Sequence, residues 1–238
     1  RLNNYIWEKD CLKNYFETRN ELMGLDYSTK ISPWLACGCI SPRQIVYEVV
    51  KYEKKRIKNK STYWLIFELF FREYFRYYSV HFGNKIFQKN GTKKQMVEYY
   101  WKKDMNTFEL WKNGKTGNPL IDANMRDMNK TGFMSNRGRQ IVASYLTRDL
   151  KLDWRLGALY FESKLIDYDV AQNWGNWNYS AGVGSDPREN RYFSIIKQQE
   201  KYDPKFQYIR FWCPEFKYEK DSIIIKKLYN GIKKFGRA

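Results

Sequence analysis

The chain has 238 residues, of which 43% are hydrophobic and 29% charged, a mixture typical of a globular protein and unlike that of a disordered or membrane-embedded one. No run of about 18 apolar residues is present, so we expect no transmembrane helix and no membrane partner. The first residues, from Arg1, show neither an initiator Met nor a signal peptide, as expected for a piece of a longer chain.

The few cysteine and histidine residues exclude further classes. The spacing of Cys11, Cys37, Cys39 and Cys213 fits neither a zinc site nor a disulfide framework, which predicts a soluble, intracellular and reduced protein in an undefined compartment. His81 is the only histidine, which disfavours histidine acid–base chemistry and most metal sites. We therefore expect no metal, and an enzyme of this composition would take its chemistry from a cofactor.

The residue pattern is mostly helical from the N-terminus onward. Two Ser-Pro pairs, at 32–33 and 41–42, can each supply a cap and a first helical residue. A helix is predicted from Pro42 to about Lys58, and another is opened by Ser61 and Thr62 and ends near Phe82. Residues 83–94 read as a basic loop. Further helices are predicted at 104–112, 119–129, 136–150 and 153–166.

The helix that ends near Phe82 carries apolar side chains on all sides, so we expect it to be buried. It also holds Glu68, Arg72 and Arg76 at intervals of four residues, on one face. Charged groups on a buried helix need partners, either other side chains or a ligand.

The C-terminal third has two further segments. Residues 167–191 are rich in Gly, Asn, Asp and aromatic residues and lack a helical period, which predicts a long irregular and functional segment. Residues 219–238 are rich in Lys and are predicted to form a loosely held basic extension. With no clear linker before it, the chain reads as one all-α domain over residues 1–218.

The formal net charge is +17, from 43 basic and 26 acidic residues, and it suggests a polyanionic partner such as DNA. A genome rich in A and T would also favour Lys, Asn, Ile and Tyr without any selection for binding. The charge alone does not decide between these readings.

Three hydroxyl residues and a Lys precede the first Ser-Pro helix, in the segment Ser28-Thr29-Lys30-Ile31-Ser32. Free backbone N–H groups and added hydroxyl donors suit a phosphate or pyrophosphate. Ser and Thr before a helix are more often simple caps, so both readings stay open.

A second set of polar residues could form hydrogen bonds with the edge of a planar heterocycle. One helix face carries Asn136, Arg139 and Gln140, and Asp167, Asp169 and Asn173 follow in the predicted irregular segment. An Arg–carboxylate pair beside amide groups offers both donors and acceptors. A structural salt bridge would use the same residues and is the commoner case.

Nine tryptophans stand out among the aromatic residues, and most are expected in the core. Closely spaced Trp side chains can also pass electrons to a cofactor, which sequence spacing cannot show. Trp101 lies in a charged segment that we expect to be exposed.

Several ordered motifs resemble the photolyase/cryptochrome flavoproteins, and three motifs indicate the cryptochrome DASH subtype. The resemblance runs from about Tyr5 to Glu215. The family motifs are Trp111-x-x-Gly114-Lys115-Thr116-Gly117-x-Pro119, Asp122-Ala123-x-Met125-Arg126, Thr131-Gly132-Phe133-Met134-Ser135-Asn136-Arg137, Asp153-Trp154-Arg155, Asp167-Tyr168-Asp169 and Asn176-Trp177. The DASH motifs are Tyr15-x-Glu17-Thr18-Arg19-Asn20, Ser135-Asn136-Arg137-Gly138-Arg139-Gln140 and Gly182-Val183-Gly184-x-Asp186-Pro187-Arg188.

The resemblance implies a helical FAD-binding domain that lacks the N-terminal α/β domain, where an antenna pigment would sit. It implies FAD as the cofactor, with Asn173 facing the flavin N5. Positions that match the cofactor-binding residues are Tyr15, Ser28, Thr29, Lys30, Ile31, Ser32, Arg139, Asp167, Tyr168, Asp169 and Asn173.

The resemblance also implies a relay and a lesion pocket. Trp177, Trp154 and Trp101 match the tryptophan chain that reduces the flavin under light. Glu68, Asn136 and Asn173 take the catalytic positions. The residues that match the lesion pocket and DNA contacts are Arg19, Glu68, Phe71, Arg72, Asn136, Arg137, Gln140 and Tyr179.

The function implied is light-driven repair of cyclobutane pyrimidine dimers by a DASH-type deoxyribodipyrimidine photo-lyase. Phe71 and Tyr179 match positions that are both Trp in duplex-specific repair enzymes, which favours single-stranded DNA. One alternative is a blue-light photoreceptor that signals without efficient repair. Another is one half of a split protein, which needs a separate α/β antenna half as its partner.

Overall fold

A computed structural model describes residues 1–93, 101–186 and 192–233. Within these ranges the chain is helical, and its only extended pairing is an isolated bridge between Lys102 and Leu152. The all-α prediction is confirmed. None of the described helices is both long and apolar enough to cross a bilayer.

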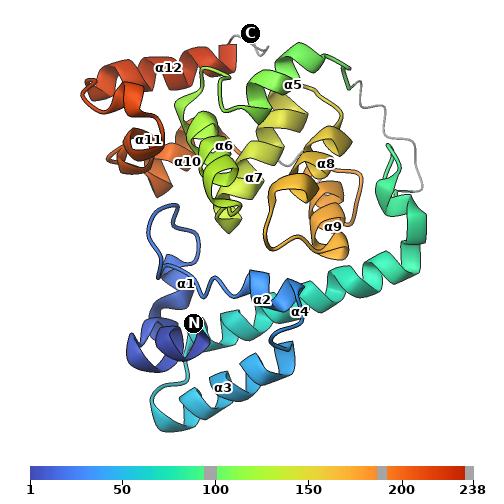
Figure 1. Ribbon diagram of the computed structural model, residues 1–238, viewed down its shortest axis with the longest axis vertical. Coiled ribbons are helices and arrows are strands. Elements are labelled where there is room, and N and C mark those ends of the chain that lie inside the picture. Colours follow the sequence, from blue (N-terminus) through green and yellow to red (C-terminus); the bar gives the residue numbers. More distant parts are fainter. Residues whose placement is uncertain (94–100, 187–191, 234–238) are drawn as a thin grey trace.

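The helices form two lobes joined by the long α4 (Figure 1). The smaller, N-terminal lobe contains π-helix η1 (Asn4–Glu8), 3-10 helix η2 (Cys11–Asn14), α1 (Tyr15–Thr18), α2 (Ser32–Ala36), α3 (Pro42–Lys55) and the first half of α4 (Lys60–Phe82). After η3 (Gly83–Phe87), the larger lobe contains α5 (Met105–Lys112), α6 (Pro119–Thr131), α7 (Asn136–Ser144), η4 (Tyr145–Asp149), α8 (Trp154–Lys164), α9 (Val170–Ala181), α10 (Ile195–Tyr202), α11 (Gln207–Trp212), η5 (Pro214–Phe216) and α12 (Asp221–Lys233).

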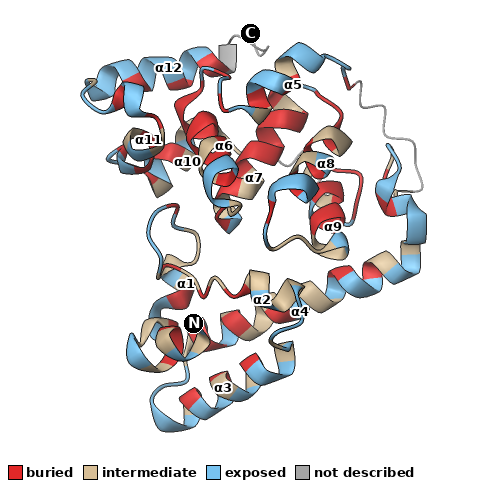
Figure 2. Ribbon diagram, viewed as in Figure 1, coloured by how far each residue is buried: buried red, intermediate tan, exposed pale blue. Residues whose placement is uncertain are grey.

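Each lobe has its own hydrophobic core, and α4 contributes to both. Leu65 and Leu69 pack with α3 and the N-terminal turns, whereas Phe75 and Tyr78 belong to the larger core. Figure 2 shows the buried positions of the larger lobe along the inner faces of α5 to α8. Because one continuous helix is anchored in both cores, it fixes the distance between the lobes.

The capping predictions are confirmed at three helices. Ser41 forms a capping box with Gln44, Ser135 accepts a hydrogen bond from the Gly138 amide, and Asp153 accepts one from the Arg155 amide. Ser32 does not cap α2, since its hydroxyl group donates to a carboxylate elsewhere.

The prediction that residues 167–191 are irregular is wrong for α9. The side chain of Asp169 caps this helix by accepting from the Gln172 amide, and Gly182 ends it in the left-handed conformation with φ of 77°. Buried contacts by Trp174, Trp177 and neighbouring residues outweigh the weak helix propensity of the Asn and Gly residues. Residues 187–191 lie outside the described residues.

The prediction that α4 is buried is also wrong for much of its surface. Phe70 is 67% exposed and Tyr77 is 75% exposed. A single helix between two lobes can bury only the faces that those lobes cover, so the apolar residues on the remaining face stay in contact with solvent.

The basic tail differs from the loose extension that was expected. α12 packs onto the larger core through Ile224 and Leu228, and the Gly231 carbonyl accepts a hydrogen bond from the Tyr145 hydroxyl at 3.0 Å. Lys226 and Lys227 of the same helix are exposed, so this Lys-rich segment is an amphipathic helix. The domain boundary at residue 218 stays a prediction. Residues 234–238 lie outside the described part of the chain.

Leu228→Ala should therefore destabilise the whole protein. The side chain is 1% exposed, and removing a buried Leu typically costs about 2–5 kcal/mol. Tyr229→Ala is the matched control because Tyr229 is 50% exposed, and we expect a change within about 0.5 kcal/mol. Urea unfolding followed by circular dichroism measures both, and equal midpoints would show that α12 does not belong to the core.

Candidate functional site

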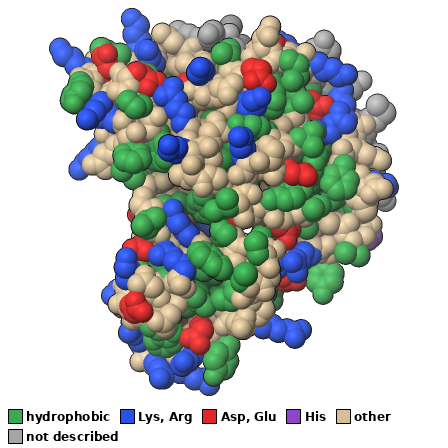
Figure 3. Space-filling model, in the orientation of Figure 1, with side chains coloured by type: hydrophobic (Ala, Val, Ile, Leu, Met, Phe, Trp, Pro, Cys, Tyr) green, Lys and Arg blue, Asp and Glu red, His purple; other side chains and the backbone are tan. Residues whose placement is uncertain are grey.

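A cavity of about 320 Å³ opens between the two lobes. Its walls come from the segment before α2, from α4 and α7, and from the region between α8 and the end of α9. Figure 3 shows the surface hollowed at this level. The volume lies in the usual range for ligand pockets, about 300–1,000 Å³.

One end of the cavity is polar. The segment Ser28–Ser32 lines it, together with Tyr15 and Arg139. Since α2 has only five residues, the start of this helix offers less than the sequence suggested, and the segment before it supplies most of the polar groups.

Asp167 links the two sides of the cavity. Both of its carboxylate oxygens accept from the Arg139 Nη2 group, Oδ2 at 2.8 Å and Oδ1 at 3.0 Å, and Oδ2 also accepts from the Ser32 hydroxyl at 2.6 Å. The Asp167 side chain is 4% exposed. The predicted Arg–carboxylate pair is therefore present, and it is at once a structural salt bridge and a wall of the cavity.

Lys30 lies beside this pair. Its ammonium group is 4.3 Å from the ring centre of Tyr27 and 4.9 Å from that of Phe133. Burial lowers the pKa of Lys30 from its usual range, while the carboxylate of Asp127 works against that shift. The Lys30 side chain therefore packs between two aromatic rings, and the residue lines the cavity together with Ser28, Thr29 and Ser32.

Part of the cavity lining is apolar, and these residues were missed by the sequence reasoning. Hydrophobic side chains give no chemical signal in a sequence, because the same residues fill any core. The apolar lining residues are Leu35, Leu65, Leu69, Phe133, Met134, Ala143, Phe161 and Leu165. Gln172, Asn176 and Ser180, spaced four residues apart on α9, were missed as well.

Asn173 and Trp177 reach the cavity from α9. The amide nitrogen of Asn173 donates to the Ala158 carbonyl at 2.9 Å, which fixes the orientation of this cavity-lining side chain. Trp177 packs edge-on against Phe161, with ring centres 5.1 Å apart. Asp169 caps the same helix and lies 3.7 Å from Arg76 and 4.0 Å from Arg72.

Polar residues of both lobes also meet at the cavity. Glu68 pairs with Arg19 and accepts from the Trp64 indole nitrogen at 2.9 Å, which supplies the partner predicted for the charged face of α4. On the opposite side, Gln140 donates to Asn136 at 3.4 Å. Glu68, Arg19, Arg72, Asn136 and Gln140 all line the cavity.

Five predicted site residues do not line the cavity. Arg137 instead bonds to Gln140 and Asn20, and Phe71 lies on the surface of α4. The five residues are Phe71, Arg137, Tyr179, Trp154 and Trp101.

The tryptophans are packed differently from a simple row. Trp101, expected to be exposed, is 8% exposed and belongs to the larger core. Trp154 contacts Trp174 with ring centres 5.7 Å apart, while Trp177 contacts Trp111 at 6.4 Å. The order in which an electron would pass among them stays a prediction.

Comparison with known proteins identifies the family. Residues 64–234 match the FAD binding domain of DNA photolyase. The chain is 57% identical over 217 residues to a cryptochrome DASH of Synechocystis sp., covering 91% of this chain and 44% of the relative. It is 58% identical to a chloroplastic/mitochondrial cryptochrome DASH of Oryza sativa, covering 91% of this chain and 37% of the relative.

Solved structures agree. The Synechocystis cryptochrome superposes with a TM-score of 0.90 at 55% identity, covering 94% of this chain and 46% of that one. A bacterial class III photolyase from Agrobacterium tumefaciens gives a TM-score of 0.85 at 32% identity, covering 100% and 49%. The chain thus spans less than half the length of these relatives.

The chain belongs to the photolyase/cryptochrome family, as its helical FAD-binding domain. Its similarity to cryptochromes of the DASH type confirms the resemblance seen in the motifs. FAD is the cofactor of this domain family.

The residues present fit that cofactor. The hydroxyl groups and the Lys in the lining suit a pyrophosphate, and the apolar lining residues suit a planar ring system. Buried Asp167 and the oriented amide of Asn173 offer acceptors to ring N–H groups.

Asp167→Asn should destabilise the protein, since it leaves the Arg139 guanidinium without its carboxylate beside the cavity. We expect a loss of about 1–3 kcal/mol. Asp221→Asn is the control, because Asp221 also pairs with an Arg but is 62% exposed, and a loss of about 0–1 kcal/mol is expected there. Thermal and urea unfolding measure both variants. A smaller effect for Asp167→Asn than for Asp221→Asn would contradict the importance of this pair.

Proposed function

We propose that the chain is the FAD domain of a light-driven lyase that repairs cyclobutane pyrimidine dimers, with preference for single-stranded DNA. One observation carries this proposal: all the residues that match the cofactor site line one cavity together with five that match the lesion pocket, Arg19, Glu68, Arg72, Asn136 and Gln140. Glu68 and Asn136 approach it from opposite lobes, so a ligand between them would contact both.

When bound, reduced FAD would supply the light-driven electron for the lesion, and this chemistry needs no acid–base pair. The residues of the chain bind and orient. Ser28–Ser32 would hold the pyrophosphate, and Arg139, Asp167, Tyr168, Asp169 and Asn173 would surround the ring. The apolar wall excludes water from this part of the cavity.

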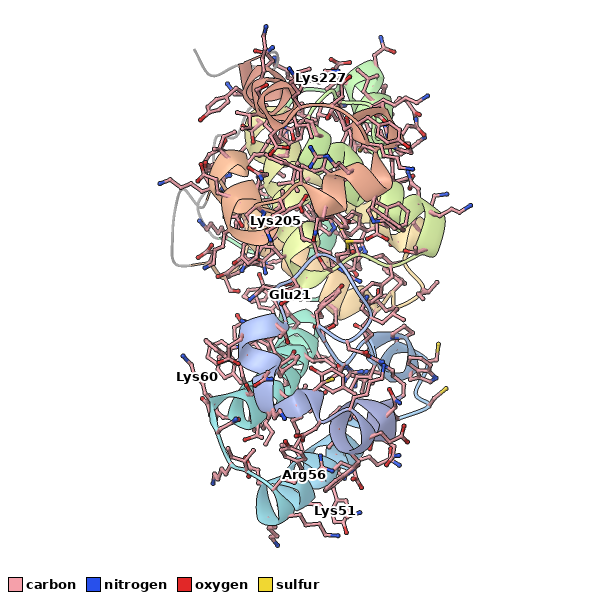
Figure 4. The ribbon with its side chains drawn as sticks, turned by 90° about the vertical axis from the view of Figure 1, so that its left-hand side faces the viewer. Glu21, Lys51, Arg56, Lys60, Lys205 and Lys227 are labelled. Carbon is pink, nitrogen blue, oxygen red and sulfur yellow. The ribbon has the colours of Figure 1, made fainter. Side chains whose placement is uncertain are left out.

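The lesion would be bound at the mouth. Glu68, fixed by Arg19 and Trp64, would accept a hydrogen bond from a base, and Asn136 would orient its other edge. Arg72, Arg137 and Gln140 lie within reach of the same region and suit the phosphate backbone. Basic residues on both lobes, such as Lys51, Lys60, Lys205 and Lys227 in Figure 4, would add a non-specific attraction to DNA.

Preference for single strands follows from the cost of base flipping. Extruding a dimer from a duplex costs a few kcal/mol of stacking and pairing. Large aromatic residues offset that cost, because stacking is worth about 1–3 kcal/mol per base. Phe71 and Tyr179 are smaller than the two Trp at the matching positions, and a single strand needs little extrusion.

A blue-light receptor function is the alternative. It is favoured by the position of Phe71 and Tyr179, neither of which lines the cavity. In that case light-driven flavin reduction would change contacts with a partner. The chain spans less than half the length of its relatives. A separate α/β half, carrying an antenna pigment, is therefore a proposed partner for either function.

Repair rates test the substrate. Light-dependent repair of one dimer should be several-fold faster in a single-stranded or bubble oligonucleotide than in a fully paired one at fixed salt. The double variant Phe71→Trp and Tyr179→Trp should shift activity toward the duplex by about fivefold, from about 1 kcal/mol of added stacking. Absence of repair on every substrate, with flavin bound, would favour the receptor.

Light-driven reduction of the flavin tests the relay. Trp177→Phe should slow this reduction by at least tenfold while leaving FAD affinity nearly unchanged, because Phe keeps the packing against Phe161 and is much harder to oxidise. Trp212→Phe is the control, since Trp212 lies on α11 and outside the cavity. Equal rates for Trp177→Phe and the unmodified protein would reject Trp177 as the proximal donor.

A further inference from the structure

The segment before α2 is held from behind by one side chain, Arg1. Its Nε donates to the Thr29 carbonyl at 2.9 Å, and its Nη2 donates to the carbonyls of Ser28 at 3.0 Å and Leu25 at 2.8 Å. Its Nη1 pairs with Asp26 at 2.7 Å. A single planar guanidinium thus fixes four groups within five residues.

Further interactions hold Asp26 and the backbone next to it in place. Asp26 also pairs with Lys9 at 2.6 Å, and the Thr18 hydroxyl donates to the Tyr27 carbonyl at 2.8 Å. The guanidinium of Arg1 lies 5.5 Å from the ring centre of buried Tyr5. The carbonyl groups of the segment are therefore turned toward the body of the N-terminal lobe.

The direction of the carbonyls determines the direction of the amides. In a trans peptide the C=O and the following N–H point to opposite sides. With the carbonyls of Ser28 and Thr29 bound to Arg1, the N–H groups of Thr29 and Lys30 point away from it. Thr29 and Lys30 line the cavity and Arg1 does not, so the cavity lies on the amide side.

These two amides are free to bind a ligand. Across residues 1–93, 101–186 and 192–233, no protein acceptor takes the N–H of Thr29 or Lys30. Lys30 adopts a left-handed conformation, with φ of 49°, which is rare for a residue other than Gly. Successive N–H groups around a left-handed residue form a concave anion-binding site.

We propose that Arg1 is a positioning residue: it holds the Ser28 and Thr29 carbonyls so that the Thr29 and Lys30 amides bind the pyrophosphate of FAD. This inference rests on the proposed placement of the pyrophosphate at Ser28–Ser32. Arg1 itself does not touch the ligand, and its effect is confined to the phosphate end of the cavity.

The affinities of Arg1 variants for FAD and for riboflavin distinguish a positioning role of Arg1 from a general contribution to stability. Arg1→Met should weaken FAD binding about tenfold and leave the affinity for riboflavin, which lacks phosphate, unchanged. Arg56→Met is the matched control. Arg56 also bonds to a carboxylate and a carbonyl, Asp10 and Trp7, but it lies at the far end of the N-terminal lobe from the cavity (Figure 4).

Arg1→Lys keeps the charge but not the geometry of the donors. It should recover only part of the FAD affinity. Full recovery would show that charge alone is needed and would overturn the positioning role. Equal losses of FAD and riboflavin affinity in Arg1→Met, or no loss of either, would overturn it as well.

A second measurement is independent of flavin. Titration of the isotope-labelled chain with inorganic pyrophosphate should shift the amide resonances of Thr29 and Lys30, and Arg1→Met should reduce these shifts. No shift in the unmodified chain would overturn the inference. Shifts at these amides in a chain that binds no FAD would support the anion site and refute the proposed flavin function.

Discussion

The buried carboxylate of Asp167 is the interaction on which the site depends. Arg139 of α7 and Ser32 of the N-terminal lobe both donate to it, so one charged group connects the two lobes across the cavity. A buried carboxylate without a charged partner would lower the stability of the fold. Loss of Arg139 would therefore leave Asp167 destabilising, and loss of Asp167 would leave the Arg139 guanidinium without its partner.

The helix α4 sets the second constraint. It is anchored in both hydrophobic cores and presents Glu68 and Arg72 to the cavity. Its charges are balanced by residues of other elements, Arg19 at the end of α1 and Asp169 at the start of α9. A rigid helix thus carries the groups proposed to bind the lesion, while the phosphate end is formed by a segment whose conformation depends on side chains behind it.

Local signals explain which predictions succeeded. Ser41, Ser135 and Asp153 could be predicted as caps because a capping interaction involves only the next three residues. The family motifs are also short stretches of sequence, and they identified most of the polar residues that line the cavity. The irregular reading of 167–191 failed because α9 is stabilised by burial against α4 and α8, which no local window contains. Burial of Trp101 and of α12 was missed for the same reason.

The sequence by itself determined the helical class, the family and the types of residue at the site. Composition can be counted without a structure, and caps and motifs depend only on residues close together in the chain. Only the tertiary structure decided which of those residues share one cavity, that Phe71, Tyr179 and Arg137 lie outside it, and that Arg1 stands behind Thr29. Contacts between residues far apart in the chain depend on how helices pack, and packing is decided by the shapes of all the buried side chains together.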